Sequence, residues 1–279
     1  MTLAIIIVSY NAAADLERCL RSLHEPPPET PHVIVVVDNA SSDGSPDVVR
    51  RWPGVRLIEA GANLGFARAN NLGIRQTAGE LILLLNSDTV VPPGAVDRLV
   101  ADLRAHPDVA VVGPRIVDAG GRAELSFGRA LTPLSELRQK TILRLQQRGV
   151  RPFPRLVERL TGRVRYPDWV SGACLLVRRA DAEQVGLLDE RYFIYAEDVD
   201  FCAAIRAAGR RVRFTPDAWI THLRGRSVAA APAATERAYR RSQILFYEKH
   251  RPRWAPWLRL YLRLRGRLPA PSDRDADAP

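Results

Sequence analysis

Five consecutive aliphatic residues, Leu81 to Leu85, most constrain what this chain can fold into. A run that is apolar at every position predicts a strand buried on both faces, which is typical of the centre of a parallel sheet. The run stops at Asn86, Ser87 and Asp88. In open α/β sheets ligands bind beyond the carboxyl ends of the strands. These side chains therefore lie where a binding site is expected, although at this point a role in capping the following helix is equally well supported.

Two earlier apolar runs end in the same way. Residues 3–8 are followed by Ser9-Tyr10-Asn11, and residues 33–37 are followed by Asp38. Segments with helical periodicity separate the runs, and this alternation predicts βαβ units and a mostly parallel α/β sheet. Because the carboxyl ends of parallel strands meet at one edge, the three polar tips converge. Three such tips favour a nucleotide pocket over three separate helix caps.

The sequence lacks the motifs that usually hold phosphates. Neither Gly-x-Gly-x-x-Gly after the first strand nor a Gly-Lys-Ser/Thr loop is present. The chain offers the Asp88 carboxylate instead, and a carboxylate repels a diphosphate unless a cation lies between them. Asp88 therefore predicts Mg²⁺ or Mn²⁺ as the bridge.

Three acidic residues in four positions mark the second half of the chain. Glu197, Asp198 and Asp200 precede a helical pattern that ends at Gly209. Acidic residues stabilise a helix start, but that role needs one or two of them. We expect Asp198 to point away from the other two, which makes it a candidate for catalysis, although the residues alone favour a structural role. His222 follows a predicted strand; a lone histidine there is usually an ordinary polar residue, but near a cation it is a candidate ligand.

Composition excludes some classes of protein. The chain has 279 residues, 46% of them hydrophobic and 26% charged, which is ordinary for a globular protein. The net charge of +10 comes almost entirely from arginine, and it suits phosphorylated ligands, nucleic acid or an anionic membrane. Three scattered cysteines predict buried free thiols in a reducing compartment. No charged leader or membrane-spanning run is recognisable, so we expect a cytoplasmic protein, or one peripheral at the inner face of the plasma membrane.

The C-terminal segment 236–268 interleaves arginines with aromatic and aliphatic residues. This pattern suits an interfacial helix on an anionic membrane, and the alternative is that the aromatic residues pack on the catalytic domain. Residues 269–279 are expected to be a disordered tail. Residues 114–167 show a weaker pattern, with an amphipathic helix near residue 140 and a basic, mobile segment over residues 148–165. No function is assigned to residues 115–167.

Taken together, the motifs resemble those of glycosyltransferase family 2, particularly its rhamnosyltransferase-like bacterial members. The match covers roughly the first 225 residues, and although each piece is weak the combination is specific. The residues that carry it are Ser9-Tyr10-Asn11, Val37-Asp38-Asn39-Ala40-Ser41, Asn63-Leu64-Gly65-Phe66-Ala67 with Asn70-Asn71, Leu85-Asn86-Ser87-Asp88, Trp169-Val170-Ser171-Gly172-Ala173, Asp189-Glu190 with Tyr192-Phe193 and Tyr195, Glu197-Asp198 with Asp200, and His222.

The resemblance implies a GT-A fold, with a nucleotide-sugar-binding half over residues 1–113, an acceptor-binding and catalytic half over residues 114–227, and amphipathic helices over residues 228–268. It implies that Asp88 and His222 bind the metal and that Asp198 is the general base. Asn86 replaces the first Asp of the family's Asp-x-Asp motif, which removes one negative charge. Donor contacts are implied for Ser9, Tyr10, Asn11, Asp38, Gly65, Asn70, Asn86, Ser87 and Asp88, and acceptor contacts for Trp169, Gly172 and Glu197.

The implied activity is inverting, metal-dependent transfer of a sugar from a nucleotide diphosphate, with dTDP-rhamnose ahead of UDP-linked donors. The acceptor would be a hydroxyl of a cell-envelope glycan or glycolipid. A catalytically inactive nucleotide-sugar-binding protein and a basic nucleic-acid-binding protein are the alternatives. Strand-tip carboxylates argue against nucleic acid, because they repel phosphate. A sugar nucleotidyltransferase would need a Gly-rich phosphate loop near its first strand.

Overall fold

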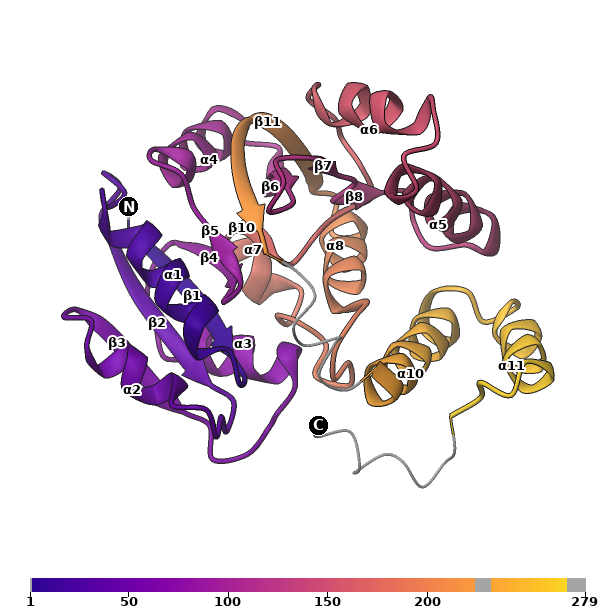
Figure 1. Ribbon diagram of the computed structural model, residues 1–279, viewed down its shortest axis with the longest axis horizontal. Coiled ribbons are helices and arrows are strands. Elements are labelled where there is room, and N and C mark those ends of the chain that lie inside the picture. The colour runs from indigo at the N-terminus through magenta and orange to yellow at the C-terminus, as the bar shows by residue number, and fades with distance from the viewer. Residues whose placement is uncertain (1, 224–231, 270–279) are drawn as a thin grey trace.

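The computed structural model describes residues 2–223 and 232–269, and these form one nine-stranded sheet with helices on both faces (Figure 1). The sheet order is β3-β2-β1-β4-β10-β6-β11-β5, β7 pairs with β6, and β8 and β9 form a separate two-stranded sheet. The strands are β1 (Leu3–Ser9), β2 (His32–Asp38), β3 (Val55–Glu59), β4 (Leu81–Asn86), β5 (Thr89–Val90), β6 (Val109–Val117), β7 (Ala123–Glu124), β8 (Phe127–Gly128), β9 (Trp169–Val170), β10 (Cys174–Arg178) and β11 (Arg211–His222). The helices are α1 (Ala13–His24), α2 (Ser45–Arg50), α3 (Phe66–Arg75), α4 (Ala95–Ala105), α5 (Pro133–Gln147), α6 (Phe153–Thr161), α7 (Arg179–Gln184), α8 (Glu197–Ala207), α10 (Pro232–His250) and α11 (Ala255–Leu264).

The parallel strands β2, β1 and β4 bring the three polar tips to one edge, as the sequence predicts. β1 pairs with both of its neighbours in parallel, with Ser9 opposite Asp38 and Val8 opposite Asn86. The predicted strand over residues 81–85 is thus confirmed as a central strand. Its five aliphatic side chains are all buried.

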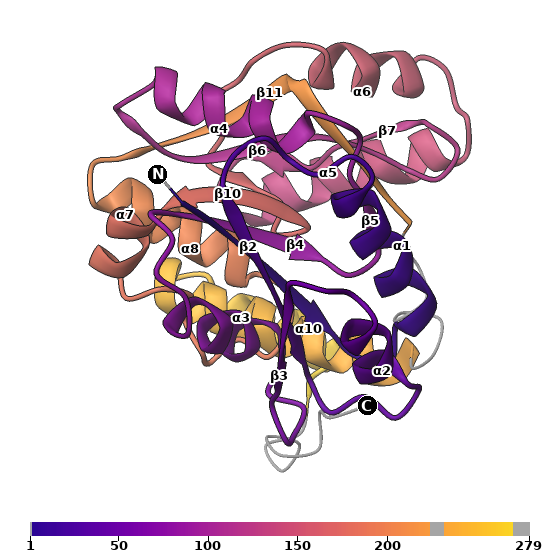
Figure 2. The same cartoon turned by 90° about the vertical axis from the view of Figure 1, so that its left-hand side faces the viewer.

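Alternation along the strands divides the core between the two faces of the sheet. Leu3, Ile5 and Ile7 of β1 pack with residues of α1, α2 and α4, while Ala4 and Ile6 pack with residues of α3 and α8. Figure 2 shows α1 and α3 on opposite sides of β1 and β2. A strand covered on both faces needs apolar residues at every position, which explains the unbroken runs.

The expectation of a mostly parallel sheet is confirmed, and β10 is an exception that runs antiparallel to both β4 and β6. One local expectation needs correction. The prediction of a mobile segment over residues 148–165 is wrong for residues 153–161, which form α6. Val157 of α6 is fully buried against Ala123 and Ile142, so a small satellite core orders this helix.

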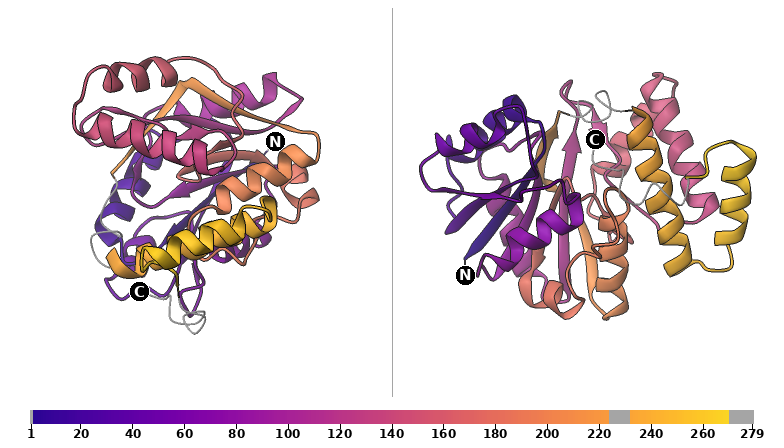
Figure 3. Two further views of the ribbon diagram at one scale, coloured as in Figure 1. Left: turned by 90° about the vertical axis from the view of Figure 1, so that its right-hand side faces the viewer. Right: turned by 90° about the horizontal axis from the view of Figure 1, so that it is seen from below.

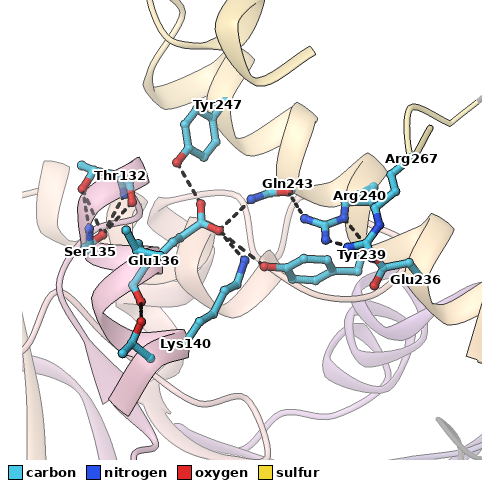
Figure 4. Close-up of polar contacts among 12 residues, drawn as sticks. Thr132, Ser135, Glu136, Lys140, Glu236, Tyr239, Arg240, Gln243, Tyr247 and Arg267 are labelled. Atoms are coloured by element: carbon cyan, nitrogen blue, oxygen red, sulfur yellow. Dashed lines mark hydrogen bonds and ion pairs between the residues drawn. The ribbon is translucent and has the colours of Figure 1, made fainter. Parts of the chain in front are cut away.

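The C-terminal helices are held to the domain by buried polar contacts. Glu136 of α5 accepts hydrogen bonds from the Tyr247 hydroxyl at 2.8 Å, the Gln243 amide at 2.6 Å and the Lys140 ammonium at 2.9 Å, with the Tyr239 hydroxyl at 3.5 Å (Figure 4). We call these five residues the Glu136 cluster. Because Tyr239, Gln243 and Tyr247 belong to α10, the cluster joins α10 to α5.

A second anchor ties α10 to α8. The buried Asp200 carboxylate accepts hydrogen bonds from the Lys249 ammonium at 2.8 Å and pairs with the His250 imidazole at 2.5 Å. α10 therefore lies against the domain along its length, and α11 lies beyond it at the outer edge of the molecule (Figures 1 and 3).

The proposed division into halves at residue 113 stays a prediction; β6 runs across it and both halves contribute strands to the sheet. Of the predicted disordered tail, residues 270–279 lie outside the described residues. In the described part of the chain, no helix combines the length and the apolar content that crossing a bilayer requires.

Candidate functional site

A cleft lies beyond the carboxyl ends of β1, β2 and β4, with about 1070 Å³ of atom-free space that includes its open mouth. Predicted donor-binding residues line it. They are Tyr10, Asn11, Gly65, Asn86, Ser87 and Asp88. Phe66, Phe193 and Ile194 contribute large apolar side chains to its wall. The cleft thus combines polar groups from the strand tips with an apolar surface.

The tip of β4 does not cap a helix. α4 begins after Gly94, and no side chain caps its first turn. Instead, the Asp88 Oδ1 lies 3.0 Å from the Nε2 of His222, and the Asn86 amide nitrogen lies 3.4 Å from the same atom. Pairing of β5 with β11 places Thr89 opposite His222 and so brings the two segments together. The capping interpretation is excluded, and Asp88 and His222 meet as predicted.

This pair has the chemistry of an incomplete cation site. The 3.0 Å contact between the Asp88 oxygen and the His222 nitrogen is a hydrogen bond, and both groups are of types that bind divalent cations. The side-chain oxygen Oδ1 of Asn86 is buried without a hydrogen-bond partner in the described residues. Within those residues, no three His, Cys, Asp or Glu side chains gather around one point. A divalent cation held here would therefore depend on oxygens of a bound ligand for most of its coordination.

Other buried oxygens without hydrogen-bond partners in the described chain belong to residues at the ends of β1 and β2 and to one residue of α3. Ser9, Asp38 and Asn70 are each almost fully buried, yet Ser9 Oγ, Asp38 Oδ1 and Asn70 Oδ1 accept or donate no hydrogen bond within residues 2–223 and 232–269. Such atoms are uncommon in folded proteins, because each one loses its hydrogen bonds to water. None of the three lines the cleft, but Ser9 and Asp38 adjoin Tyr10 and Asn39, which do.

The loops at the tips of β1 and β2 are joined by reciprocal hydrogen bonds. The Asn11 backbone N–H donates to the Ser41 hydroxyl at 2.9 Å, and the Ser42 backbone N–H donates to the Asn11 carbonyl oxygen Oδ1 at 2.8 Å. Asn11 and Ala40 have φ values of 48° and 67°, in the left-handed region that non-glycine residues seldom adopt. These loops are thus held in one conformation at the predicted base-binding end.

Gly65 precedes α3, and its backbone packs against the loop before α8. Only a residue without a side chain fits at this contact. Its φ is 78°, and a Cβ atom there would lie 2.5 Å from the Phe193 carbonyl oxygen. The adjacent Phe66 N–H donates to this same oxygen at 2.6 Å. A larger residue would push the two segments apart, so Gly65 shapes the cleft by close backbone approach.

Asp198 is held by backbone donors. Its Oδ2 accepts the Gly172 N–H at 2.9 Å, and its Oδ1 accepts the Val199 N–H at 2.8 Å. Burial raises the pKa of Asp198, although the two backbone donors oppose this shift. The raised pKa makes its carboxylate a better proton acceptor than an exposed aspartate.

Glu197 is buried beside it. Its Oε2 has no hydrogen-bond partner in the described part of the chain, and burial followed by the Asp198 charge raises the pKa of Glu197 well above its usual range. The two residues before it, Tyr195 and Ala196, have φ values of 69° and 64°. Consecutive non-glycine residues in this strained region are typical of functional sites.

A short path connects Asp198 to the tip of β4. Gly172 donates to Asp198, and the carbonyl oxygen of the next residue, Ala173, accepts the Asn86 N–H at 3.0 Å. A Cβ on Gly172 would lie 3.3 Å from the Asp198 Cβ and 3.5 Å from the Phe66 ring, which lines the cleft. The predicted base and the predicted metal ligands therefore share one edge of the sheet.

Trp169 occupies a different environment from the other predicted residues. Its ring is buried in the core against Gly128, and its indole N–H donates to the Arg129 carbonyl oxygen at 2.9 Å. Trp169 therefore packs in the core. Its predicted contact with the acceptor substrate stays a prediction.

Sequence reasoning missed part of the cleft wall. The first turns of α10 contribute Ala234, Thr235 and Ala238, and the loop before α8 contributes Ile194. Phe193 and Tyr195, from the same loop, also line the cleft and belong to the residues that carry the family resemblance. Small residues on an amphipathic helix give no comparable signal for α10.

Comparisons with known proteins agree with this geometry. The family model described as glycosyl transferase family 2 matches residues 4–155, and the model described as glycosyl transferase family group 2 matches residues 81–266. The chain is 34% identical over 274 residues to the N-acetylglucosaminyl-diphospho-decaprenol L-rhamnosyltransferase of Mycobacterium tuberculosis, covering 94% of this chain and 89% of the relative. It is 25% identical over 235 residues to the rhamnosyltransferase WbbL of Escherichia coli, covering 76% and 80%.

A solved structure shows the same fold. The mannosyltransferase PcManGT of Pyrobaculum calidifontis, solved with GDP-Man and Mn²⁺, superimposes with a TM-score of 0.61 at 21% identity, covering 92% of this chain and 67% of that one. The predicted GT-A fold is confirmed.

Proposed function

The chain belongs to glycosyl transferase family 2 and is a glycosyltransferase, and from this premise we propose that it transfers rhamnose with inversion from dTDP-rhamnose to a lipid-linked glycan acceptor. The observation that carries the proposal is the convergence of Asp88, His222 and Asp198 at one sheet edge. The sugar and the acceptor are those named for the mycobacterial relative, whose name specifies an N-acetylglucosaminyl-diphospho-lipid.

The donor would lie along the tips of β1, β2 and β4. Asp38 would accept a hydrogen bond from the base, with Ser9, Tyr10 and Asn11 around it, and Asn70 and Asn86 would contact the ribose and the diphosphate. Support comes from the buried oxygens of Asp38, Asn70 and Asn86, which have no partner in the described residues. Gly65, which lines the cleft, would contact the donor through its backbone.

Asp88 and His222 would hold Mg²⁺ or Mn²⁺ against the diphosphate. When bound, the cation supplies positive charge that neutralises the leaving group. Without it, Asp88 would repel the donor. The 3.0 Å separation of the Asp88 oxygen and the His222 nitrogen supports this role.

Asp198 would act as the general base. The acceptor hydroxyl oxygen forms a bond to C1 of the sugar, the bond from C1 to the diphosphate oxygen breaks, and the hydroxyl proton moves to the Asp198 carboxylate. The Gly172 N–H fixes the carboxylate for this step. Glu197 would position the acceptor or tune the charge of Asp198.

Acceptors of this kind lie in a membrane, so we propose that the protein works at the inner surface of the plasma membrane. The proposal is tested by incubating the protein with a panel of nucleotide sugars, an N-acetylglucosaminyl-diphospho-lipid, and Mn²⁺ or EDTA. Mass spectrometry should detect a deoxyhexosyl product with dTDP-rhamnose and metal. Nucleotide binding without any transfer would instead identify a catalytically inactive nucleotide-sugar-binding protein.

A further inference from the structure

The outermost helix presents an apolar face to solvent. Trp257 is 66% exposed, Tyr261 51% and Leu264 78%. With Trp254 before the helix, these residues follow helical spacing and share one side of α11. Leu262, on the opposite side, is fully buried. These side chains therefore form an exposed apolar stripe on a helix whose other side is packed against the protein. Leu260 lies at the border of the stripe and is 45% exposed.

α10 has no comparable stripe, although its sequence is equally rich in apolar and basic residues. Its large apolar side chains Ile244, Phe246 and Tyr247 are buried. The Glu136 cluster and the Asp200 contacts hold the helix against α5 and α8. The membrane contact predicted for residues 236–268 therefore narrows to α11 and the residues next to it.

Basic residues surround the exposed face of α11. Residues 253–268 contain five arginines and no acidic residue. Arg259 pairs with Glu248 of α10. Arg263 and Arg265 are exposed beside the apolar stripe, and the Arg265 guanidinium lies 5.8 Å from the centre of the Tyr261 ring. A stripe of tryptophan, tyrosine and leucine bordered by arginine matches the interface between lipid headgroups and acyl chains. The positive border favours an anionic lipid surface over a neutral one.

We propose that the face formed by Trp254, Trp257, Leu260, Tyr261 and Leu264 docks onto an anionic lipid bilayer. Arg263 and Arg265 contact the headgroups. Because the first turns of α10 line the cleft and α10 packs on α11, docking would bring the cleft close to the membrane. The proposal rests on the proposed function only for its purpose, the delivery of a lipid-linked acceptor.

Vesicle co-sedimentation of the full chain tests the surface. Wild type should bind vesicles that contain phosphatidylglycerol and bind pure phosphatidylcholine much more weakly. Trp257→Ser/Leu264→Ser should lower the partition coefficient by roughly tenfold or more, because two large apolar side chains no longer leave water. Arg263→Glu/Arg265→Glu should lower it by more than about 25-fold at low salt, because loss of each arginine costs about fivefold and each new carboxylate is repelled by the anionic surface.

Matched variants control for composition and net charge. Trp219→Ser removes another exposed tryptophan, from β11, and Arg98→Glu/Arg104→Glu makes the same charge change on α4. Both should bind as wild type does. Equal recovery of wild type with and without vesicles, or equal losses in the controls, would overturn the proposal. So would a wild-type dimer that becomes monomeric in Trp257→Ser/Leu264→Ser, because a second copy would then cover the face.

The outcome is separable from that of the proposed function. Transfer to a water-soluble acceptor analogue should be unchanged in the α11 variants. Loss of vesicle binding with intact transfer to that analogue supports the surface. Vesicle binding by a protein that transfers no sugar would refute the proposed function and leave the surface standing.

Discussion

Two buried polar regions of this molecule differ in how their oxygens are satisfied. In the Glu136 cluster, both carboxylate oxygens accept hydrogen bonds, from Tyr247 on one side and from Gln243 and Lys140 on the other. Under the strand-tip cleft, Asp38 and Asn86 each keep a buried oxygen without a partner in the described residues. Unsatisfied buried polar atoms are destabilising, and they also occur elsewhere in the described residues, so those near the strand tips support a ligand site only together with the adjoining cleft. A satisfied carboxylate indicates structure.

The same contrast separates carboxylates that are adjacent in the sequence. Asp200 is satisfied by Tyr192, Lys249 and His250, so its role is to hold α10. Asp198 accepts only backbone N–H groups, and Glu197 keeps an oxygen without a partner in the described chain. Three acidic residues that look alike in the sequence thus have different roles.

Among residues near the cleft, removal of the proposed general base should reduce sugar transfer the most. Asp198→Asn should lower kcat for sugar transfer by ~10²–10⁴-fold, because the acceptor proton loses its carrier. Nucleotide binding, measured by calorimetry, should stay within a few-fold of wild type. Asp47→Asn, at an exposed site on α2, is the control. Near wild-type transfer by Asp198→Asn would remove Asp198 from the mechanism.

Asp88→Asn should have the next largest effect. Loss of one charged group that stabilises the leaving diphosphate should reduce transfer by ~10²–10³-fold. The variant should also lose the dependence of nucleotide affinity on Mn²⁺, as followed by calorimetry with and without EDTA. Wild-type affinity that does not respond to Mn²⁺ would argue against a cation at Asp88 and His222.

In the Glu136 cluster, Glu136→Ala should lower the stability of the protein and leave kcat for sugar transfer unchanged. It leaves the Tyr247 hydroxyl and the Gln243 amide without their acceptor, which should lower the free energy of unfolding by about 1–3 kcal/mol. Urea titration measures this, with Glu183→Ala at an exposed site as the control. A Glu136→Ala protein of wild-type stability but with a ~10²-fold lower kcat would reverse the assignment, since that is the size expected of a catalytic group.

Glu197→Gln should give the smallest effect, with the opposite sign. The raised pKa of Glu197 means that the folded state retains a proton that the unfolded chain has released. Stability therefore falls as pH rises from the ordinary glutamate pKa to the folded-state pKa. Gln lacks this penalty, so the variant should be more stable than wild type at neutral pH, with the gain absent at acid pH. Thermal unfolding across pH measures the difference, and a destabilised variant at neutral pH would show that the carboxyl has a partner.

The sequence predicts the donor side of the fold well because its signals are local. Apolar runs define β1, β2 and β4, and parallel pairing then dictates that Ser9, Asp38 and Asn86 meet at one edge. Asp88 and His222 are 134 residues apart, and no local pattern joins them. Their meeting depends on a two-residue pairing of β5 with β11, and it was the resemblance to a family that anticipated it.

The C-terminal region shows what local patterns cannot decide. α10 and α11 have similar mixtures of arginine, aromatic and aliphatic residues, yet Phe246 is buried and Trp257 is exposed. The difference arises from contacts made by α5 and α8, which are remote in the sequence. The contribution of α10 to the cleft and the packing role of Trp169 were inaccessible for the same reason.

A crystal structure with dTDP and Mn²⁺ tests the central claim most directly. We expect anomalous scattering from Mn²⁺ within coordinating distance of Asp88, His222 and the diphosphate, with Asp38, Asn70 and Asn86 hydrogen-bonded to the nucleotide. The Asp198 carboxylate should face the same cleft. Manganese bound away from Asp88, or a nucleotide that leaves those buried oxygens without partners, would contradict the account.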